Sequence, residues 1–101
     1  MRRKLRLYFE AKRDIMLAPT WYEEQREGLG DDFLLCVEAA LAAIAANPIA
    51  YVSIQEGIHR YLLHRFPYAV FYLLTDDSII VLAIFHHHRD PDSWRNRFGQ
   101  G

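Results

Sequence analysis

The sequence predicts an α+β fold, in which a helical hairpin packs on one face of an antiparallel β-sheet in the order β-α-α-β-β-β. The evidence is a change of period along the chain. Residues 5–9 alternate apolar and polar side chains, residues 11–46 carry apolar side chains at helical spacing, and residues 57–89 contain three runs rich in Val, Ile, Tyr and Phe. The turns between these runs are too short for a helical crossover, so adjacent strands must be antiparallel. We expect one domain, spanning residues 1–101.

The first strand is predicted over Leu5–Phe9, and the first helix runs from Ala11 to about Glu27. Pro19 lies inside this helix, where it removes a backbone hydrogen bond. We therefore expect either a kink near Ala18 or a new helix start at Pro19. Gly28 is predicted to cap the C-terminus of this helix.

The second helix is predicted to begin at Asp31 or Asp32 and to end at Ala46, before Asn47-Pro48. Acidic residues at its N-terminus favour this start because they complement the helix dipole. Its buried stripe is predicted to comprise Phe33, Val37, Ala40, Leu41 and Ile44. The short glycine loop before it indicates an antiparallel helix pair.

Residues 50–56 are predicted to form either an irregular connection or a short strand. The three strands of 57–89 should be separated by turns at Phe66-Pro67 and at Asp76-Asp77-Ser78. After them we expect a turn at Asp90-Pro91-Asp92 and one helical turn over residues 93–97.

Composition narrows the class of protein. The chain has 101 residues, of which 51% are hydrophobic and 25% are charged, so it is not of disordered composition. Its net charge of -1 argues against a dedicated nucleic-acid binder, since such proteins are usually strongly basic. The start of the chain is too interrupted for a signal peptide, and no apolar run approaches the roughly 20 residues of a membrane helix. We therefore expect a cytoplasmic protein that does not associate with membranes.

Several local motifs, in this order and spacing, resemble the RelE/ParE superfamily of toxins from type II toxin–antitoxin modules, and the plasmid-stabilisation, ParE-like branch fits best. The matching stretches are Trp21-Tyr22-Glu23-Glu24 with Gly28-Leu29-Gly30 and Phe33, then Asn47-Pro48, residues 60–68 with Tyr72, residues 80–86, and Arg89-Asp90-Pro91 with Trp94. Together they cover nearly the whole chain.

This resemblance implies two alternative functions. ParE-like members poison DNA gyrase by binding it, whereas RelE-like members are endoribonucleases that cut messenger RNA on the ribosome. Both are held inactive by a partner antitoxin. We expect a ParE-like toxin without a cofactor, neutralised by a cognate antitoxin, and the balance favours a protein that is not an enzyme. The alternatives are a RelE-like mRNA endoribonuclease and a degenerate partner that only binds antitoxin. Whether the chain forms a homo-oligomer is left open.

If the chain is a nuclease, its catalytic residues should be His64, His86, Arg60, Arg65 and Arg89. Histidine supplies acid and base near neutral pH, and arginine stabilises phosphate charge. Against this reading, the sequence has only two lysines, Lys4 and Lys12, and neither lies in residues 57–89. For Arg60 the alternative is surface charge or an ion pair with an acid such as Glu56.

No metal site is predicted. In the run His86-His87-His88, strand alternation directs the first and third side chains to one face and the second to the other, which leaves an incomplete zinc site. The residues predicted to bind the partner are Tyr68, Tyr72 and Trp94. One face of the sheet should pack on the helices, and we expect the other, exposed face to receive the antitoxin by strand or helix addition.

Overall fold

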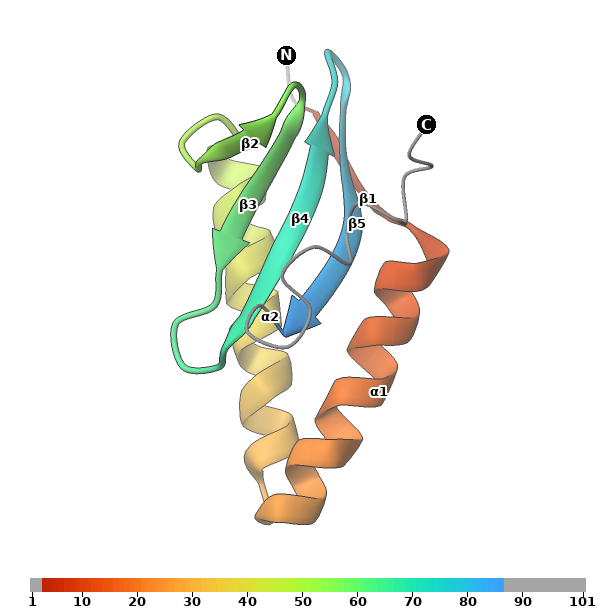
Figure 1. Ribbon diagram of the computed structural model, residues 1–101, viewed down its shortest axis with the longest axis vertical. Coiled ribbons are helices and arrows are strands. Elements are labelled where there is room, and N and C mark those ends of the chain that lie inside the picture. The colour runs from red at the N-terminus through yellow and green to blue at the C-terminus, as the bar shows by residue number, and fades with distance from the viewer. Residues whose placement is uncertain (1–2, 87–101) are drawn as a thin grey trace.

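The computed structural model describes residues 3–86 of the chain. Its elements are β1 (Lys4–Leu7), α1 (Phe9–Gln25), α2 (Leu29–Ala46), β2 (Ser53–Gln55), β3 (Ile58–Leu62), β4 (Tyr68–Leu74) and β5 (Ser78–His86). The predicted α+β class and the helical hairpin are confirmed (Figure 1). Of the two structures left open for residues 50–56, the chain forms the short strand. The turn and the helical turn predicted after residue 89 lie outside the described residues.

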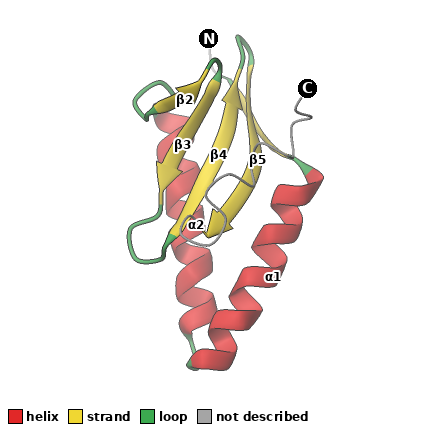
Figure 2. Ribbon diagram, in the orientation of Figure 1, coloured by secondary structure: helices red, strands yellow, loops and turns green. Residues whose placement is uncertain are grey.

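The five strands form one mixed sheet in the order β1-β5-β4-β3-β2. Neighbouring strands from β2 to β5 are antiparallel, as predicted, while β1 lies parallel to β5 with Leu5 opposite Ile79. A parallel pair is possible here because β1 and β5 are not joined by a tight turn. Both helices and strands β2 to β4 lie between them in the sequence. Both helices lie on the same side of the sheet (Figure 2), and neither is long and apolar enough to cross a membrane.

Helix α1 begins earlier and is more continuous than the sequence predicts. The predicted strand end at Phe9 is wrong, because the Tyr8 N–H pairs with the Val81 carbonyl and the Tyr8 carbonyl already accepts the first helical bond, from Lys12. A new start at Pro19 is also wrong, since one helix runs from Phe9 through Pro19 to Gln25.

The loop between the helices is fixed by one carboxylate. Glu23 accepts hydrogen bonds from the N–H groups of Gly28 and Gly30, both at 2.9 Å. Gly28 adopts a left-handed conformation with φ of 88°, but α1 is capped two residues earlier, at Arg26, so the predicted cap position is wrong by two residues. Gly30 lies where the two helices approach closely, because a Cβ atom there would be 2.7 Å from the Pro19 carbonyl oxygen.

The main core lies between the helices and the sheet. Four residues of the predicted α2 stripe are buried in it, and Leu41 packs half-buried at its margin. The sheet contributes Tyr61, Val70, Tyr72, Ile79, Val81 and Ile84, among others.

The other face of the sheet carries a second, smaller cluster. It comprises Ile58, Ala69, Phe71 and Ala83, with Phe85 packed against it. The expectation that this face is exposed is wrong for these residues, since Ala69 and Ala83 are fully buried and Phe71 nearly so. Two of them are small, and the Phe71 and Phe85 rings contact each other.

Candidate functional site: a groove between α1 and β5

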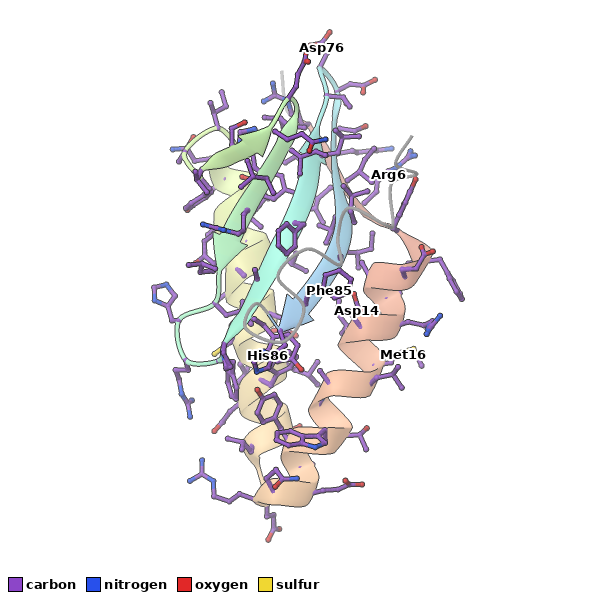
Figure 3. The ribbon with its side chains drawn as sticks, viewed as in Figure 1. Arg6, Asp14, Met16, Asp76, Phe85 and His86 are labelled. Carbon is purple, nitrogen blue, oxygen red and sulfur yellow. The ribbon has the colours of Figure 1, made fainter. Side chains whose placement is uncertain are left out.

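A groove of about 320 Å³ lies between α1 and the last residues of β5. We call it the α1–β5 groove. It is lined by Asp14, Leu17, Ala18, Trp21, Tyr68, Ile84, Phe85 and His86. Figure 3 shows Asp14 on α1 close to the end of β5, where Phe85 and His86 lie. Of the residues predicted to form a site, the groove contains His86 and Tyr68.

A β-bulge places His86 in this groove. In the β4–β5 register Phe71 lies opposite Ala83 and Tyr72 opposite Val81, so Leu82 has no residue opposite it. The extra residue reverses the alternation of β5. Ile79 and Val81 face the helices before the bulge and Ile84 faces them after it, while Ala83 and Phe85 belong to the opposite face. Bulges commonly redirect a side chain in this way. Here the bulge directs His86 to the helix side, where its ring lies edge to face against the Tyr68 ring, with 5.3 Å between the ring centroids.

Asp14 joins α1 to the end of β5. Its Oδ2 atom accepts a hydrogen bond of 2.9 Å from the Ile84 N–H. The partner strand β1 stops at Leu7, opposite Val81, so the edge of β5 beyond Val81 is no longer covered by a strand. The Asp14 carboxylate therefore satisfies a backbone donor that β1 would otherwise have paired, and it fixes the wall of the groove.

Helix α1 exposes four large apolar side chains, two of which, Leu17 and Trp21, line the groove. Phe9, Met16, Leu17 and Trp21 are all more than half exposed. Phe9 and Met16 are seven residues apart and Leu17 and Trp21 four apart, so each pair shares one side of the helix, and the two pairs lie about 100° apart around it. Neighbouring exposed apolar side chains such as Leu17 and Trp21, beside a groove, commonly mark a surface that binds a partner. The sequence signal was these apolar side chains of α1, which fall outside the buried stripe that contains Ala11 and Tyr22.

Two other predicted catalytic residues lie in a different groove. Arg60 and His64 line a groove of about 390 Å³ at the outer edge of β3, together with Tyr51, Val52, Tyr61 and Leu62. We call it the β3-edge groove. The His64 Nε2 atom is 3.4 Å from the Tyr61 hydroxyl. The ion pair considered between Arg60 and Glu56 is absent, because the one ion pair among residues 3–86 joins Arg65 to Asp32.

Arg65 belongs to neither groove. Its guanidinium lies 3.5 Å from the Asp32 carboxylate at the start of α2, and it also lies over the Phe66 ring. Within residues 3–86 the predicted nuclease residues are therefore divided among three places. Arg89 lies outside the described residues.

Tyr72 is an unsuitable contact residue in this structure. Its side chain is fully buried, and its hydroxyl donates a hydrogen bond of 2.6 Å to the Pro48 carbonyl. Burial, with a smaller contribution from Tyr51, raises the pKa of Tyr72 to about 12. Tyr68 is largely buried but borders the α1–β5 groove, while Trp94 lies outside the described residues.

Within residues 3–86, no three His, Cys, Asp or Glu side chains are close enough together to hold a metal ion. His87 and His88 lie outside this range.

Comparison with known structures first shows a similar fold. The fold is similar to that of a solved chain of the chromosomal ParDE TA system from P. aeruginosa, with a TM-score of 0.71 over 81% of this chain and 92% of the other. The two sequences are 17% identical, so this likeness concerns the fold alone. No curated protein matches the sequence.

The family follows from the sequence itself. Residues 6–91 match the model of the ParE toxin of type II toxin–antitoxin system, parDE. The match extends over most of the chain, and the chain belongs to this family. The predicted relationship to ParE-like toxins is confirmed.

Proposed function

We propose that this protein is a ParE-like toxin that blocks DNA gyrase in the cytoplasm by binding to it, and that a cognate antitoxin neutralises it. The family supports the toxin role. Gyrase as the target rests on the resemblance to ParE-like toxins and on the arrangement of the residues that a nuclease would need.

The separation of the candidate nuclease residues carries the proposal. Cleavage of RNA through a ribose hydroxyl needs a base, an acid and a cation within hydrogen-bond reach of one phosphate. Here His86 lines one groove, Arg60 and His64 line another, and Arg65 pairs with Asp32. A toxin that acts by binding needs no such convergence.

The antitoxin is the occupant that we assign to the α1–β5 groove and the exposed apolar surface of α1. This surface includes Trp21, a large, relatively rigid side chain of the type that anchors protein interfaces. A partner that covers it removes the apolar patch from water, so free toxin should be the less soluble form.

A two-arm assay tests the target. Purified protein is added to a gyrase supercoiling reaction and, separately, to a translating extract in which messenger RNA is mapped for cuts. We expect supercoiling to be inhibited and messenger RNA to stay intact. Cleavage at ribosome-bound codons with normal supercoiling would refute the gyrase proposal in favour of a RelE-like nuclease.

A matched pair of substitutions tests the antitoxin surface. Leu17 on α1 and Leu35 on α2 are both 62% exposed, but only Leu17 lines the α1–β5 groove. Leu17→Asp should weaken antitoxin binding by roughly 30-fold, as expected for a buried interface anchor, whereas Leu35→Asp should leave it within about 3-fold. Equal effects of the two changes on the dissociation constant would remove the groove from the interface.

A further inference from the structure

Positive charge is concentrated at the junction between β1 and α1. Residues 3–13 contain five cations and a single acid, Glu10, whereas the remainder of the chain contains seven cations and twelve acids. The net charge of -1 is therefore the sum of a basic segment and an acidic remainder. We call these five cations the β1–α1 basic patch; they are Arg3, Lys4, Arg6, Lys12 and Arg13.

Three of these cations lie along β1 or just before it. This strand is at one edge of the sheet, and Leu5 and Leu7 pack against the main core. Lys4 and Arg6 alternate with these leucines and are exposed. Figure 3 shows Arg6 at the edge of the molecule where β1 leads into α1. Arg3 is fixed in place, because its Nε atom donates a hydrogen bond of 2.8 Å to a carbonyl group in the turn before β5.

Helix α1 contributes the other two cations. It begins at Phe9, so that Tyr8 alone separates it from β1. Ala11 is fully buried, whereas the next two residues, Lys12 and Arg13, are exposed. Tyr8 is 43% exposed, and a tyrosine hydroxyl can donate to a phosphate oxygen. The patch is therefore a continuous stretch of exposed donors along the start of the chain.

The described part of the chain does not neutralise this patch. None of its five cations forms an ion pair within residues 3–86. Asp77 lies beside Lys4 in the fold, but its carboxylate accepts hydrogen bonds from the hydroxyls of Thr75 and Ser78. The carboxylate of Asp14 accepts a backbone N–H of β5. The cations are thus available to an anion from outside.

Their spacing favours a polyanion over a small anion. Lys4 and Arg6 are two residues apart on one face of a strand, a separation of about 7 Å. Lys12 and Arg13 leave α1 in directions about 100° apart. A single phosphate could contact one or two of these side chains, whereas a polyanion could contact several in turn. Duplex DNA is such a polyanion, with one charge per about 1.7 Å of its axis.

We propose that the β1–α1 basic patch binds the phosphate backbone of duplex DNA without reading its sequence. The inference rests on the proposed function for the identity of the polyanion, since gyrase acts on duplex DNA. Contacts from lysine and arginine to phosphates supply affinity but no sequence preference. The patch gives the toxin a contact with the DNA that gyrase holds, and because the rest of the chain is acidic, binding to free DNA is weak.

The salt dependence of DNA binding tests the patch. Fluorescence anisotropy is measured with a labelled duplex of about 20 base pairs between about 50 and 200 mM salt. Four or five phosphate contacts should give a slope of about -4 in a plot of log K against log salt, whatever the DNA sequence. Arg6→Gln and Arg13→Gln should each reduce the magnitude of this slope by about 1 and weaken binding by up to about fivefold. Arg26→Gln is the matched control, because Arg26 is an exposed arginine at the other end of α1.

The control should keep the parental slope, and thermal melts check that each variant is folded. Equal slopes for Arg6→Gln, Arg13→Gln and Arg26→Gln would overturn the proposal, as would the absence of binding at about 1 mM duplex, a concentration above the usual range of non-specific dissociation constants. Single-stranded DNA and duplex RNA of the same length are the comparison ligands. Tighter binding to either of them would overturn the assignment to duplex DNA.

A gyrase experiment separates this inference from the proposed function. The double variant Arg6→Gln/Arg13→Gln is compared with the parent protein in binding to gyrase without DNA and in inhibition of supercoiling. We expect unchanged affinity for gyrase and a roughly tenfold higher concentration for half-inhibition. A loss of affinity for gyrase itself would overturn the inference, because the patch would then contact gyrase and not DNA. If the parent bound duplex DNA with the expected slope but did not inhibit gyrase, the gyrase target would be refuted and the DNA contact would stand.

Discussion

Gly30 provides a direct test of how closely the two helices pack. A Cβ atom at this position would lie 2.7 Å from the Pro19 carbonyl oxygen and 2.9 Å from Glu23 Oε1. The carbonyl belongs to the backbone of α1, so Gly30→Ala must push the helices apart. It must also strain the hydrogen bond between the Gly30 N–H and Glu23. Alanine favours the helix by up to about 1 kcal/mol, whereas overpacking costs about 1–3 kcal/mol. We expect a net loss of about 1–2 kcal/mol in the free energy of unfolding.

For a domain of this size, about 1 kcal/mol corresponds to a change of roughly 4–8 °C in melting temperature. Gly30→Ala should therefore melt about 5–15 °C below the parent protein when unfolding is followed by circular dichroism. Gly28→Asn is the control, because nothing lies within 4 Å of a Cβ atom there and asparagine tolerates a left-handed backbone. If Gly30→Ala melted at or above the parent temperature, the close helix approach would be wrong.

Three further perturbations test the core and the groove wall. Tyr72→Phe leaves the buried Pro48 carbonyl without its donor, so denaturant unfolding should show a loss of about 1–3 kcal/mol; an unchanged midpoint would contradict this bond. The raised pKa of Tyr72, about 12 against about 10 in the unfolded chain, means that folding favours the neutral phenol. Its contribution is therefore complete below pH 10 and falls by about 2–3 kcal/mol as the pH rises to 12, a slope that Tyr72→Phe should flatten. Asp14→Leu removes the acceptor of the Ile84 N–H, so the Ile84 amide should exchange faster by NMR, while Asp14→Asn, which keeps a side-chain oxygen, should retain most of its protection.

The fold could be predicted from the sequence because its local signals agree with one another. Helical spacing in α2, the stop at Asn47-Pro48, and the turns before β4 and β5 each correspond to an observed element boundary within a few residues. The errors occur where a tertiary bond overrides a local pattern. The alternation at residues 5–9 continues to Phe9, but the bond from the Tyr8 N–H to Val81 ends the strand earlier and turns the chain into α1.

The candidate site was predicted less well, because it depends on which elements lie side by side. His86 was predicted as a nuclease residue and Tyr68 as a partner contact, and both line the groove, but Asp14, Leu17 and Trp21 were not considered for the site. Their role follows from the packing of α1 along β5, which no local pattern specifies. In the same way, Arg60 on β3 and His64 just after it line one groove, whereas His86, which was named with them as a nuclease candidate, lines another.

The bulge at Leu82 explains why alternation alone could not place His86. Counting in twos from Val81 would put Ala83 and Phe85 on the helix side and His86 on the other face, whereas the structure has Ile84 on the helix side and His86 beside Tyr68. Nothing in the run from Ile79 to Phe85 reveals the reversal, since every side chain in it is apolar and either register buries apolar groups. The reversal is fixed instead by partners outside the strand: β1 ends opposite Val81, and Asp14 then takes the Ile84 N–H. The residue that gives the groove its imidazole is thus positioned by an aspartate on α1 and by one extra residue in β5.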